Sequence, residues 1–395
     1  MKTAVPKKPA ADETLNTLGA YGPWAAKLLG NGPPALSLRT GRFRNLNSWR
    51  KQARAKMWEL LAPPEMPKPP RPRIEAQGTY DGLAWEQLSW QLPWGPRTEA
   101  VFLKPASAGP KDRLPGILAL HDHGGRKYFG WKKIAQIDSN LHPMMRAHRD
   151  ECYGGLSWAN EIAKRGYAVL CHDTFLFASR RARVAEVSPR VRYEGIDPGP
   201  GEIPGEIQRY NQWAGQHEHI VAKALFSAGT TWPGVYLRED QTALSILAAR
   251  KDVNAARLGC GGLSGGGLRT VFLAGMDPRI ASCFCAGFFT TWRDFVLHKN
   301  WTHTWMTYAP LVPGLLDFPE ILGLRAPSPT LVLNTAQDPL YTLSEVKRAA
   351  AMLREVYKRA GASANYRFSL YDGGHQLHAP MQAEAFDWLD RGLKP

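Results

Sequence analysis

The chain has 395 residues, of which 44% are hydrophobic, a net charge of +15 and five cysteines. This length and apolar content suffice for one large buried core and an accessory segment. Two classes of protein are excluded. No apolar run reaches the ~18 residues that a membrane-spanning helix needs, and an odd number of cysteines argues against a disulfide framework.

The N-terminus and the cysteines indicate the compartment. Residues 1–8, M-K-T-A-V-P-K-K, lack the apolar core of a signal peptide, although a chain already trimmed of one would look the same. Cys283 and Cys285 alternate on a strand-like apolar run, so both should face one side of a buried strand. We therefore expect a reducing, cytoplasmic setting, and a secreted mature form stays the alternative.

Positive charge gathers in the N-terminal segment. Residues 1–73 hold 14 Lys and Arg against 4 Asp and Glu, which accounts for +10 of the net charge of +15. Short helices broken by glycine and proline are predicted here, and the proline-rich stretch 63–72 is a stiff connector. We place a boundary there: residues 1–72 form a basic helical segment, and residues 73–395 form the main domain.

Basic residues interleaved with aromatic ones in this segment could form a nucleic-acid-binding face. The residues concerned are Arg39, Arg42, Phe43, Arg44, Trp49, Arg50, Lys51, Arg54 and Lys56. The alternative is an amphipathic helix over residues 46–61 whose basic side faces water or the main domain. We favour the helix and expect no nucleic-acid partner.

From residue 73 onward, strand-like and helix-like runs alternate. Strands are predicted near residues 74–80, 84–92, 98–104, 115–121, 167–172, 256–261, 280–287, 329–334 and 365–371, with helices between the later ones and a final helix over 379–393. Such alternation with apolar strands is typical of a mostly parallel sheet covered by helices on both faces. The sequence therefore predicts an α/β protein.

A loop with two glycines follows the fourth predicted strand. It reads H-D-H-G-G (121–125), and its glycines free backbone amides to face an incoming carbonyl. The amide of His123 is therefore a candidate oxyanion-hole donor. His121 and His123 could instead be half of a metal site, with His217 and His219 as another half, but no third ligand stands at a recognisable spacing and we expect no metal.

Residues 262–266 read G-L-S-G-G and match the pattern G-x-S-x-G. A strand-like run precedes them at 256–261, and a helix-like run follows at 268–275. A serine on such a sharp strand-to-helix turn has strained backbone angles, and the glycines remove side chains that would collide with neighbouring backbone. The turn aims the hydroxyl and the first helix amides at one point. Ser264 is therefore the candidate nucleophile, and the amide of Gly265 is the second oxyanion-hole donor.

Two stretches, about 175–234 and 288–324, do not fit the minimal alternation, although residues 208–226 are helical in pattern. Both leave the sheet at the carboxyl ends of strands, the edge where open α/β sheets keep their sites, so we expect them to form the walls or cap of a pocket. The candidate substrate-binding residues are Phe288, Trp292 and Trp305. The alternative is that these rings pack the insert against the sheet or against a second subunit.

A serine nucleophile needs a general base and a carboxylate that orients the base. Where the serine lies on a strand-to-helix turn, the three residues occur along the chain in the order Ser, then Asp or Glu, then His. Asp338 lies in the loop after the eighth predicted strand, and His375 lies in the turn after the ninth. We therefore assign Asp338 as the acid and His375 as the base. Asp372 is the alternative acid and His378 the alternative base.

These motifs together carry a resemblance. From about residue 73 to its end the chain resembles the α/β-hydrolases, and more narrowly their dienelactone-hydrolase and acetyl-xylan-esterase-like branch. The matching positions are 121–125, Asp173, Ser264, Asp338 and His375. The resemblance implies an α/β-hydrolase fold in which Ser264, Asp338 and His375 are the catalytic triad. It also implies that the amides of His123 and Gly265 form the oxyanion hole.

We therefore expect a serine hydrolase that cleaves a small-molecule or carbohydrate ester, an aryl ester included, through an acyl-enzyme and without a cofactor. The same residues also cleave amides and some carbon–carbon bonds next to ketones, so a peptidase-like enzyme or a C–C bond hydrolase is the alternative. A non-catalytic binding protein on this fold is the alternative of another class. The complete set of candidate catalytic positions counts against it.

Overall fold

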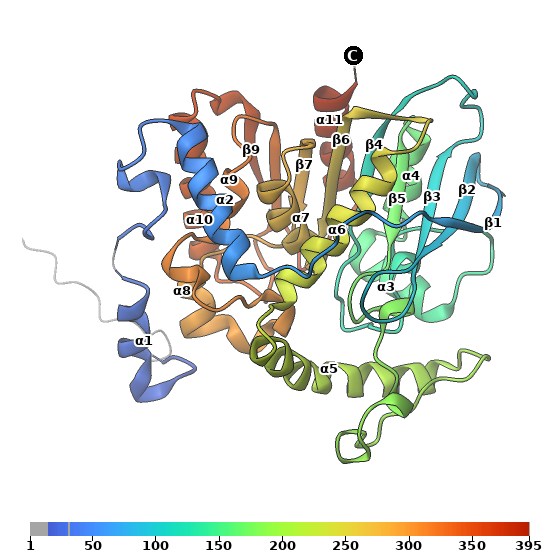
Figure 1. Cartoon of the computed structure of the whole chain (residues 1–395), viewed down its shortest axis with the longest axis horizontal. Coiled ribbons are helices and arrows are strands. Elements are labelled where there is room, and N and C mark those ends of the chain that lie inside the picture. The colour runs from blue at the N-terminus through green and yellow to red at the C-terminus, as the bar shows by residue number, and fades with distance from the viewer. Residues whose placement is uncertain (1–14, 31, 395) are drawn as a thin grey trace, which may run out of the picture.

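The computed structural model describes residues 15–30 and 32–394. At its centre lies a nine-stranded sheet with the order β1-β2-β3-β5-β4-β6-β7-β8-β9 (Figure 1). Its strands are β1 Arg73–Tyr80, β2 Leu83–Trp90, β3 Thr98–Pro105, β4 Leu114–Ala119, β5 Ala168–His172, β6 Val253–Leu263, β7 Ile280–Ala286, β8 Thr330–Thr335 and β9 Tyr366–Tyr371. Each predicted strand is confirmed to within a few residues.

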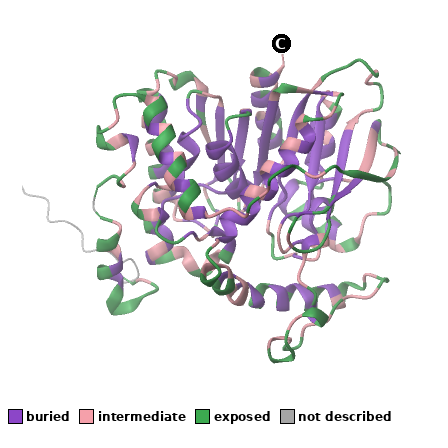
Figure 2. Cartoon of the chain, in the orientation of Figure 1, coloured by how far each residue is buried: buried purple, intermediate pink, exposed green. Residues whose placement is uncertain are grey.

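The sheet is parallel from β5 to β9 and antiparallel at the edge formed by β1, β2 and β3. Four of the parallel strands, β4, β5, β7 and β8, are buried almost throughout, which explains why they are continuous apolar runs in the sequence. Figure 2 shows the central strands as buried. The predicted mostly parallel sheet is therefore confirmed.

Helices cover both faces of the sheet (Figure 1). One face packs against α6 (Trp232–Ala248), α7 (Gly265–Met276), α9 (Phe318–Gly323) and α10 (Leu343–Arg359). The other face packs against α3 (Pro143–Tyr153), α4 (Trp158–Lys164) and α11 (Ala379–Leu393). Each face therefore has its own hydrophobic core. Successive side chains of a strand point to opposite faces, so Phe102 of β3 is buried in one core and Val101 in the other. Cys283 and Cys285 share one core, as predicted.

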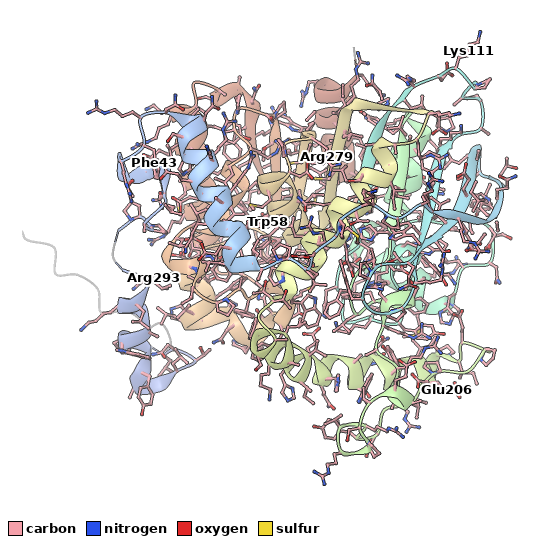
Figure 3. The ribbon with its side chains drawn as sticks, in the orientation of Figure 1. Phe43, Trp58, Lys111, Glu206, Arg279 and Arg293 are labelled. Atoms are coloured by element: carbon pink, nitrogen blue, oxygen red, sulfur yellow. The ribbon has the colours of Figure 1, made fainter. Side chains whose placement is uncertain are left out.

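The N-terminal segment contains α1 (Gly22–Leu28) and the predicted helix, α2 (Leu46–Leu61). Trp49, Ala53, Met57 and Leu61 recur every four residues along α2 and are fully buried in the core on the α6 and α7 side. Trp58 of α2, labelled in Figure 3, lies with its ring centroid 4.6 Å from the guanidinium of Arg238 in α6. The boundary at residue 72 falls in the extended stretch between α2 and β1.

Several basic residues of this segment have partners in the main domain. Arg54 donates hydrogen bonds to the carbonyls of Gly275 and Leu324, at 2.8 and 3.0 Å, near the ends of α7 and α9. Arg50 donates to the carbonyl of Ala326 at 2.8 Å. Because orphan carbonyls at helix ends favour cations, Arg54 ties α2 to α7 and α9, and Arg50 ties it to the loop after α9.

The two inserts lie at the carboxyl edge of the sheet. The first contains α5 (Pro204–Ser227), which runs along the lower edge of the molecule in Figure 1 and contains the predicted helix over 208–226. The second, dense in aromatic residues, contains α8 (Trp292–Asp294) and several short turns. In the part of the chain that the structure describes, no helix is both long and apolar enough to span a membrane.

Candidate active site

Ser264 lies on the turn between β6 and α7 with φ of 60° and ψ of −118°, a combination that residues with a side chain rarely adopt. Its N–H donates to the carbonyl of Ala286 at 2.9 Å, and its carbonyl accepts from the N–H of Leu268 at 2.8 Å. These bonds to β7 and α7 hold the strained turn. The expected elbow is therefore present, with the serine at the carboxyl end of a central strand.

Two glycines of the turn allow it to approach β4. A Cβ atom at Gly262 or at Gly266 would overlap with the carbonyl oxygen of Leu120. We expected these glycines because a side chain would collide with neighbouring backbone, and the carbonyl of Leu120 is the backbone group concerned.

Asp338 and His375 come together because β8 and β9 are parallel neighbours and each residue lies in the loop that follows its strand. The ring Nδ1 of His375 lies 2.6 Å from Oδ2 of Asp338. The other oxygen, Oδ1, accepts from the N–H of Leu340 at 3.0 Å. The carboxylate is therefore fixed by the backbone while it holds the imidazole.

This pairing determines the tautomer of His375. A carboxylate only accepts, so Nδ1 carries the proton and Nε2 is left with a free lone pair. Nε2 is buried and has no hydrogen-bond partner among the described residues. Gly287, with φ of 56°, lies against the ring: a Cβ there would be 3.1 Å from Cε1 of His375. The imidazole is thus held in one orientation with an unused acceptor at Nε2.

The two amides expected to form an oxyanion hole lie close together. A Cβ atom on Gly265 would be only 2.8 Å from the backbone nitrogen of His123. Ser264, Gly265, His123 and His375 all line one cavity of about 430 Å³. The structure therefore brings the candidate nucleophile, base and both amides to a single cavity.

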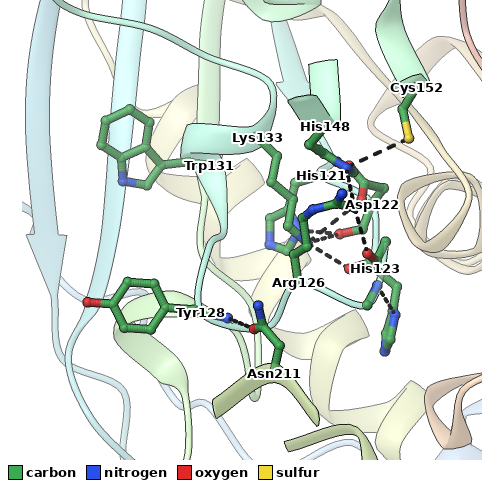
Figure 4. A network of polar contacts seen from close by, with 12 residues as sticks. His121, Asp122, His123, Arg126, Tyr128, Trp131, Lys133, His148, Cys152 and Asn211 are labelled. Carbon is green, nitrogen blue, oxygen red and sulfur yellow. Dashed lines mark hydrogen bonds and ion pairs between the residues drawn. The ribbon is translucent and has the colours of Figure 1, made fainter. Parts of the chain in front are cut away.

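Lys133 fixes the orientation of the His123 amide (Figure 4). Its buried ammonium donates to the carbonyls of Asp122 and His123, both at 2.8 Å. The carbonyl of Asp122 and the N–H of His123 belong to one trans peptide, in which they point in opposite directions. Because Lys133 binds that carbonyl, the N–H of His123 points away from Lys133.

The carboxylate of Asp122 belongs to the network in Figure 4. It accepts from Tyr153 at 2.5 Å, lies 3.1 Å from Nε2 of His148, and is 3.7 Å from the ammonium of Lys133. Burial alone would raise the pKa of Asp122, but His148 and Lys133 outweigh it and hold the pKa well below its usual value. Burial in turn lowers the pKa of Lys133 to about 8, an effect that Asp122 partly offsets.

Glu218 of α5 joins the loop at residues 121–125 to the aromatic insert. Its carboxylate lies 2.7 Å from both Nε2 of His123 and the ammonium of Lys127, and it accepts from Thr304 Oγ1 at 2.7 Å. Burial would raise the pKa of Glu218, but Lys127 and His123 outweigh it and keep the pKa below its usual range. The two inserts therefore close the pocket through one buried carboxylate.

The cavity is walled by both inserts and by the loop after β8. Besides the residues already placed there, it is lined by Gly124, Gly125, Gly215, Glu218, Leu268, Phe288, Thr302, His303, Thr304, Thr307, Leu340 and Tyr341. The expectation that the inserts form the pocket walls agrees with this lining.

The three aromatic residues predicted to bind substrate occupy different places. Phe288 lines the cavity. Trp292 and Trp305 are not among the described residues that line it: Trp292 is buried and stacks on Phe318 with 3.8 Å between ring centroids, and Trp305 is partly exposed. The Trp292 ring therefore packs against a residue of its own insert and not against the cavity.

The alternative acid and base lie outside the cavity lining. His378 is the N-cap residue of α11, with Nε2 3.2 Å from the carbonyl of Glu151, and Asp372 is exposed. Of the paired histidines weighed as metal ligands, His121 donates to the carbonyl of Asp122 and His123 contacts Glu218.

Sequence reasoning missed Lys133, Glu218, His303 and Thr307. Glu218 stands between His217 and His219, a run that drew attention only as a metal motif. Lys133 and His303 lie in irregular segments with no periodic pattern. No local signal shows which of these residues turn toward the site.

We compared the chain with known proteins to identify its fold. No family model matches the chain. It is 25% identical over 310 residues to "Putative hydrolase YtaP" of Bacillus subtilis (strain 168), which covers 78% of this chain and 88% of that protein.

Solved structures are similar over most of the chain. A putative acetyl xylan esterase from Bacteroides fragilis NCTC 9343 matches with a TM-score of 0.64 and 19% identity, over 90% of this chain and 82% of that one. A glucuronoyl esterase from Solibacter usitatus matches with a TM-score of 0.61 and 15% identity, over 93% and 98% of the two chains. The protein therefore has the α/β-hydrolase fold, which confirms the predicted fold class and the resemblance.

Proposed function

We propose that the protein is a serine hydrolase that cleaves a carboxylic ester through an acyl-enzyme. The observation that carries this proposal is the convergence at one cavity of a strained serine, a histidine oriented by a buried carboxylate, and two adjacent backbone amides. Each group alone has structural explanations, whereas together they supply a nucleophile, a base and an oxyanion site.

In the proposed mechanism His375 Nε2 takes the proton of Ser264 as Oγ attacks the ester carbonyl. Asp338 holds the imidazole in the required tautomer and stabilises the imidazolium that forms. The amides of His123 and Gly265 donate to the oxygen that becomes negative. His375 then returns the proton to the leaving alcohol, and water releases the acyl group by the same steps.

The class of substrate is also a proposal. The two solved structures named above are described as a putative acetyl xylan esterase and a glucuronoyl esterase, and the curated relative as a putative hydrolase. These descriptions support a small-molecule or carbohydrate ester over a peptide. The mechanism uses side chains and backbone amides alone, so we propose that the enzyme works without a cofactor.

Turnover of p-nitrophenyl acetate and butyrate tests the proposal. Ser264→Ala and His375→Ala should lose turnover, and Asp338→Asn should lose about 10⁴-fold in kcat, because its amide would favour the wrong tautomer of His375. Ser139→Ala, at an exposed serine, is the control and should match the wild type. The matching p-nitroanilides test the peptidase alternative. Cleavage of these amides that is faster than cleavage of the esters would favour a peptidase. Ester turnover that survives in Ser264→Ala would contradict the proposal.

A further inference from the structure

We propose that His303 and Thr307 form a subsite that binds a hydroxyl group of the substrate, so that the preferred substrate is an uncharged, hydroxylated ester. This inference rests on the proposed function and deepens it. Both residues belong to the aromatic insert, and both line the cavity that contains Ser264.

The contacts of His303 determine what it offers to the cavity. Nδ1 lies 3.2 Å from the carbonyl oxygen of Lys299 and 2.6 Å from Oγ1 of Thr302. A carbonyl can only accept, so Nδ1 carries the proton and Nε2 is a bare acceptor. Burial lowers the pKa of His303 to about 4, so the imidazole is neutral at neutral pH.

The ring of His303 is held in place by aromatic neighbours. Its centroid lies 4.2 Å from that of Phe295 and 5.0 Å from that of Tyr341. Tyr341 in turn donates to the carbonyl of Gly287 at 2.8 Å, beside His375. The acceptor is therefore preorganised at a fixed place near the candidate base.

Thr307 supplies a second unused polar group. Its residue is 1% exposed, and Oγ1 has no hydrogen-bond partner among the described residues. The same is true of Nε2 of His303 and Nε2 of His375. Buried polar atoms are nearly always paired, because an unpaired one loses its bonds to water without replacement. In the proposed mechanism the partner of His375 is Ser264, and the other two atoms are left for the substrate.

The chemistry of this pair selects the ligand. Nε2 of His303 can only accept, and Oγ1 of Thr307 can donate or accept, which together suit a hydroxyl group. Among the described residues that line the cavity, none is Lys or Arg, and the one carboxylate, Glu218, is already paired with Lys127 at 2.7 Å. A substrate carboxylate would find no cation there, so an uncharged group is favoured.

Matched esters test the subsite on either side of the scissile bond. Ethyl 3-hydroxybutyrate is compared with ethyl butyrate for the acyl side, and glycerol 1-acetate with propyl acetate for the alcohol side. The wild type should show a higher kcat/KM for the hydroxylated member of at least one pair. His303→Phe and Thr307→Val should each lower that ratio by about tenfold, the size of one neutral hydrogen bond. Thr307→Ser, which keeps the hydroxyl, should restore it.

The outcomes separate this inference from the proposed function. Ser264-dependent turnover of all four esters with no preference for a hydroxyl would overturn the subsite and leave the proposed function intact. An equal loss on both members of a pair in both variants would mean a structural role and would also overturn it. Faster turnover of monoethyl succinate than of ethyl butyrate would overturn the preference for uncharged groups. No Ser264-dependent turnover of any ester would overturn the proposed function itself.

Discussion

Gly265 is the position where a single methyl group should disturb the proposed oxyanion hole most. A Cβ there would lie 2.8 Å from the backbone nitrogen of His123, so one of the two amides must move. Gly265→Ala should lower kcat by about 100-fold, the loss typical of removing one oxyanion donor. Gly205→Ala, in α5 where a Cβ meets nothing within 4 Å, is the matched control. Full activity in Gly265→Ala would mean that the two amides do not act together.

Lys133 acts on the same amide from the other side of its peptide bond. Lys133→Met removes the donor to the carbonyls of Asp122 and His123, so the His123 N–H should lose its fixed direction. We expect kcat on p-nitrophenyl acetate to fall by about tenfold or more, with a smaller change in KM, because the amide matters most in the transition state. Lys132→Met, at the exposed neighbouring lysine, should change neither constant. A rise in KM alone would assign Lys133 to ground-state binding.

The lowered pKa of Lys133 should also make the stability of the protein depend on pH. Burial lowers its pKa to about 8, whereas an unfolded chain would have about 10.4. Between these values the unfolded chain holds more protons at this residue, so its contribution to the free energy of unfolding rises with pH. Urea unfolding at about pH 7.5 and about pH 9.5 should show the wild type gaining stability relative to Lys133→Met. A difference that stays constant would contradict the depressed pKa.

At the scale of elements, Arg54 links α2 to the C-terminal ends of α7 and α9. Arg54→Met removes the donor to the carbonyls of Gly275 and Leu324, and should lower the free energy of unfolding by about 1–3 kcal/mol. Arg44→Met, at an exposed arginine of the same segment, should stay within about 0.5 kcal/mol of the wild type. Denaturant unfolding measures both. An equal effect of the two changes would mean that Arg54 contributes only charge.

The strands were predictable because the residues of each strand alone show its burial pattern. The continuous apolar runs of β5 and β8 are those of strands buried on both faces, and the glycines around Ser264 mark a turn that no other residue type fits. α2 was predictable from the four-residue spacing of its buried side chains.

The walls of the cavity were only partly predictable. Sequence placed both inserts at the carboxyl edge, but not which of their residues face Ser264. Trp292 and Phe288 are both aromatic residues near the start of the same insert, yet Trp292 stacks on Phe318 while Phe288 lines the cavity. That difference depends on the path of a segment with short turns and little regular structure. The roles assigned to Ser264, Asp338 and His375 stay predictions until they are tested.

At the scale of the whole molecule, the N-terminal segment shares a core with the main domain. Trp49 is fully buried in that core, so Trp49→Ala should lower the free energy of unfolding by about 3–5 kcal/mol. Unfolding should stay a single cooperative transition in the wild type and in the variant. Trp24→Ala, at an exposed tryptophan of α1, is the control. Two transitions, with only one shifted by Trp49→Ala, would show that residues 1–72 fold as a separate unit.

The most direct test of the proposed function is the intact mass of the protein after reaction with a fluorophosphonate probe, which labels activated serines. We predict one adduct per chain on Ser264, absent from Ser264→Ala and formed much more slowly in His375→Ala, because the base activates the hydroxyl. No adduct on the folded wild type, or an adduct that persists in Ser264→Ala, would contradict the assignment of Ser264 as the nucleophile.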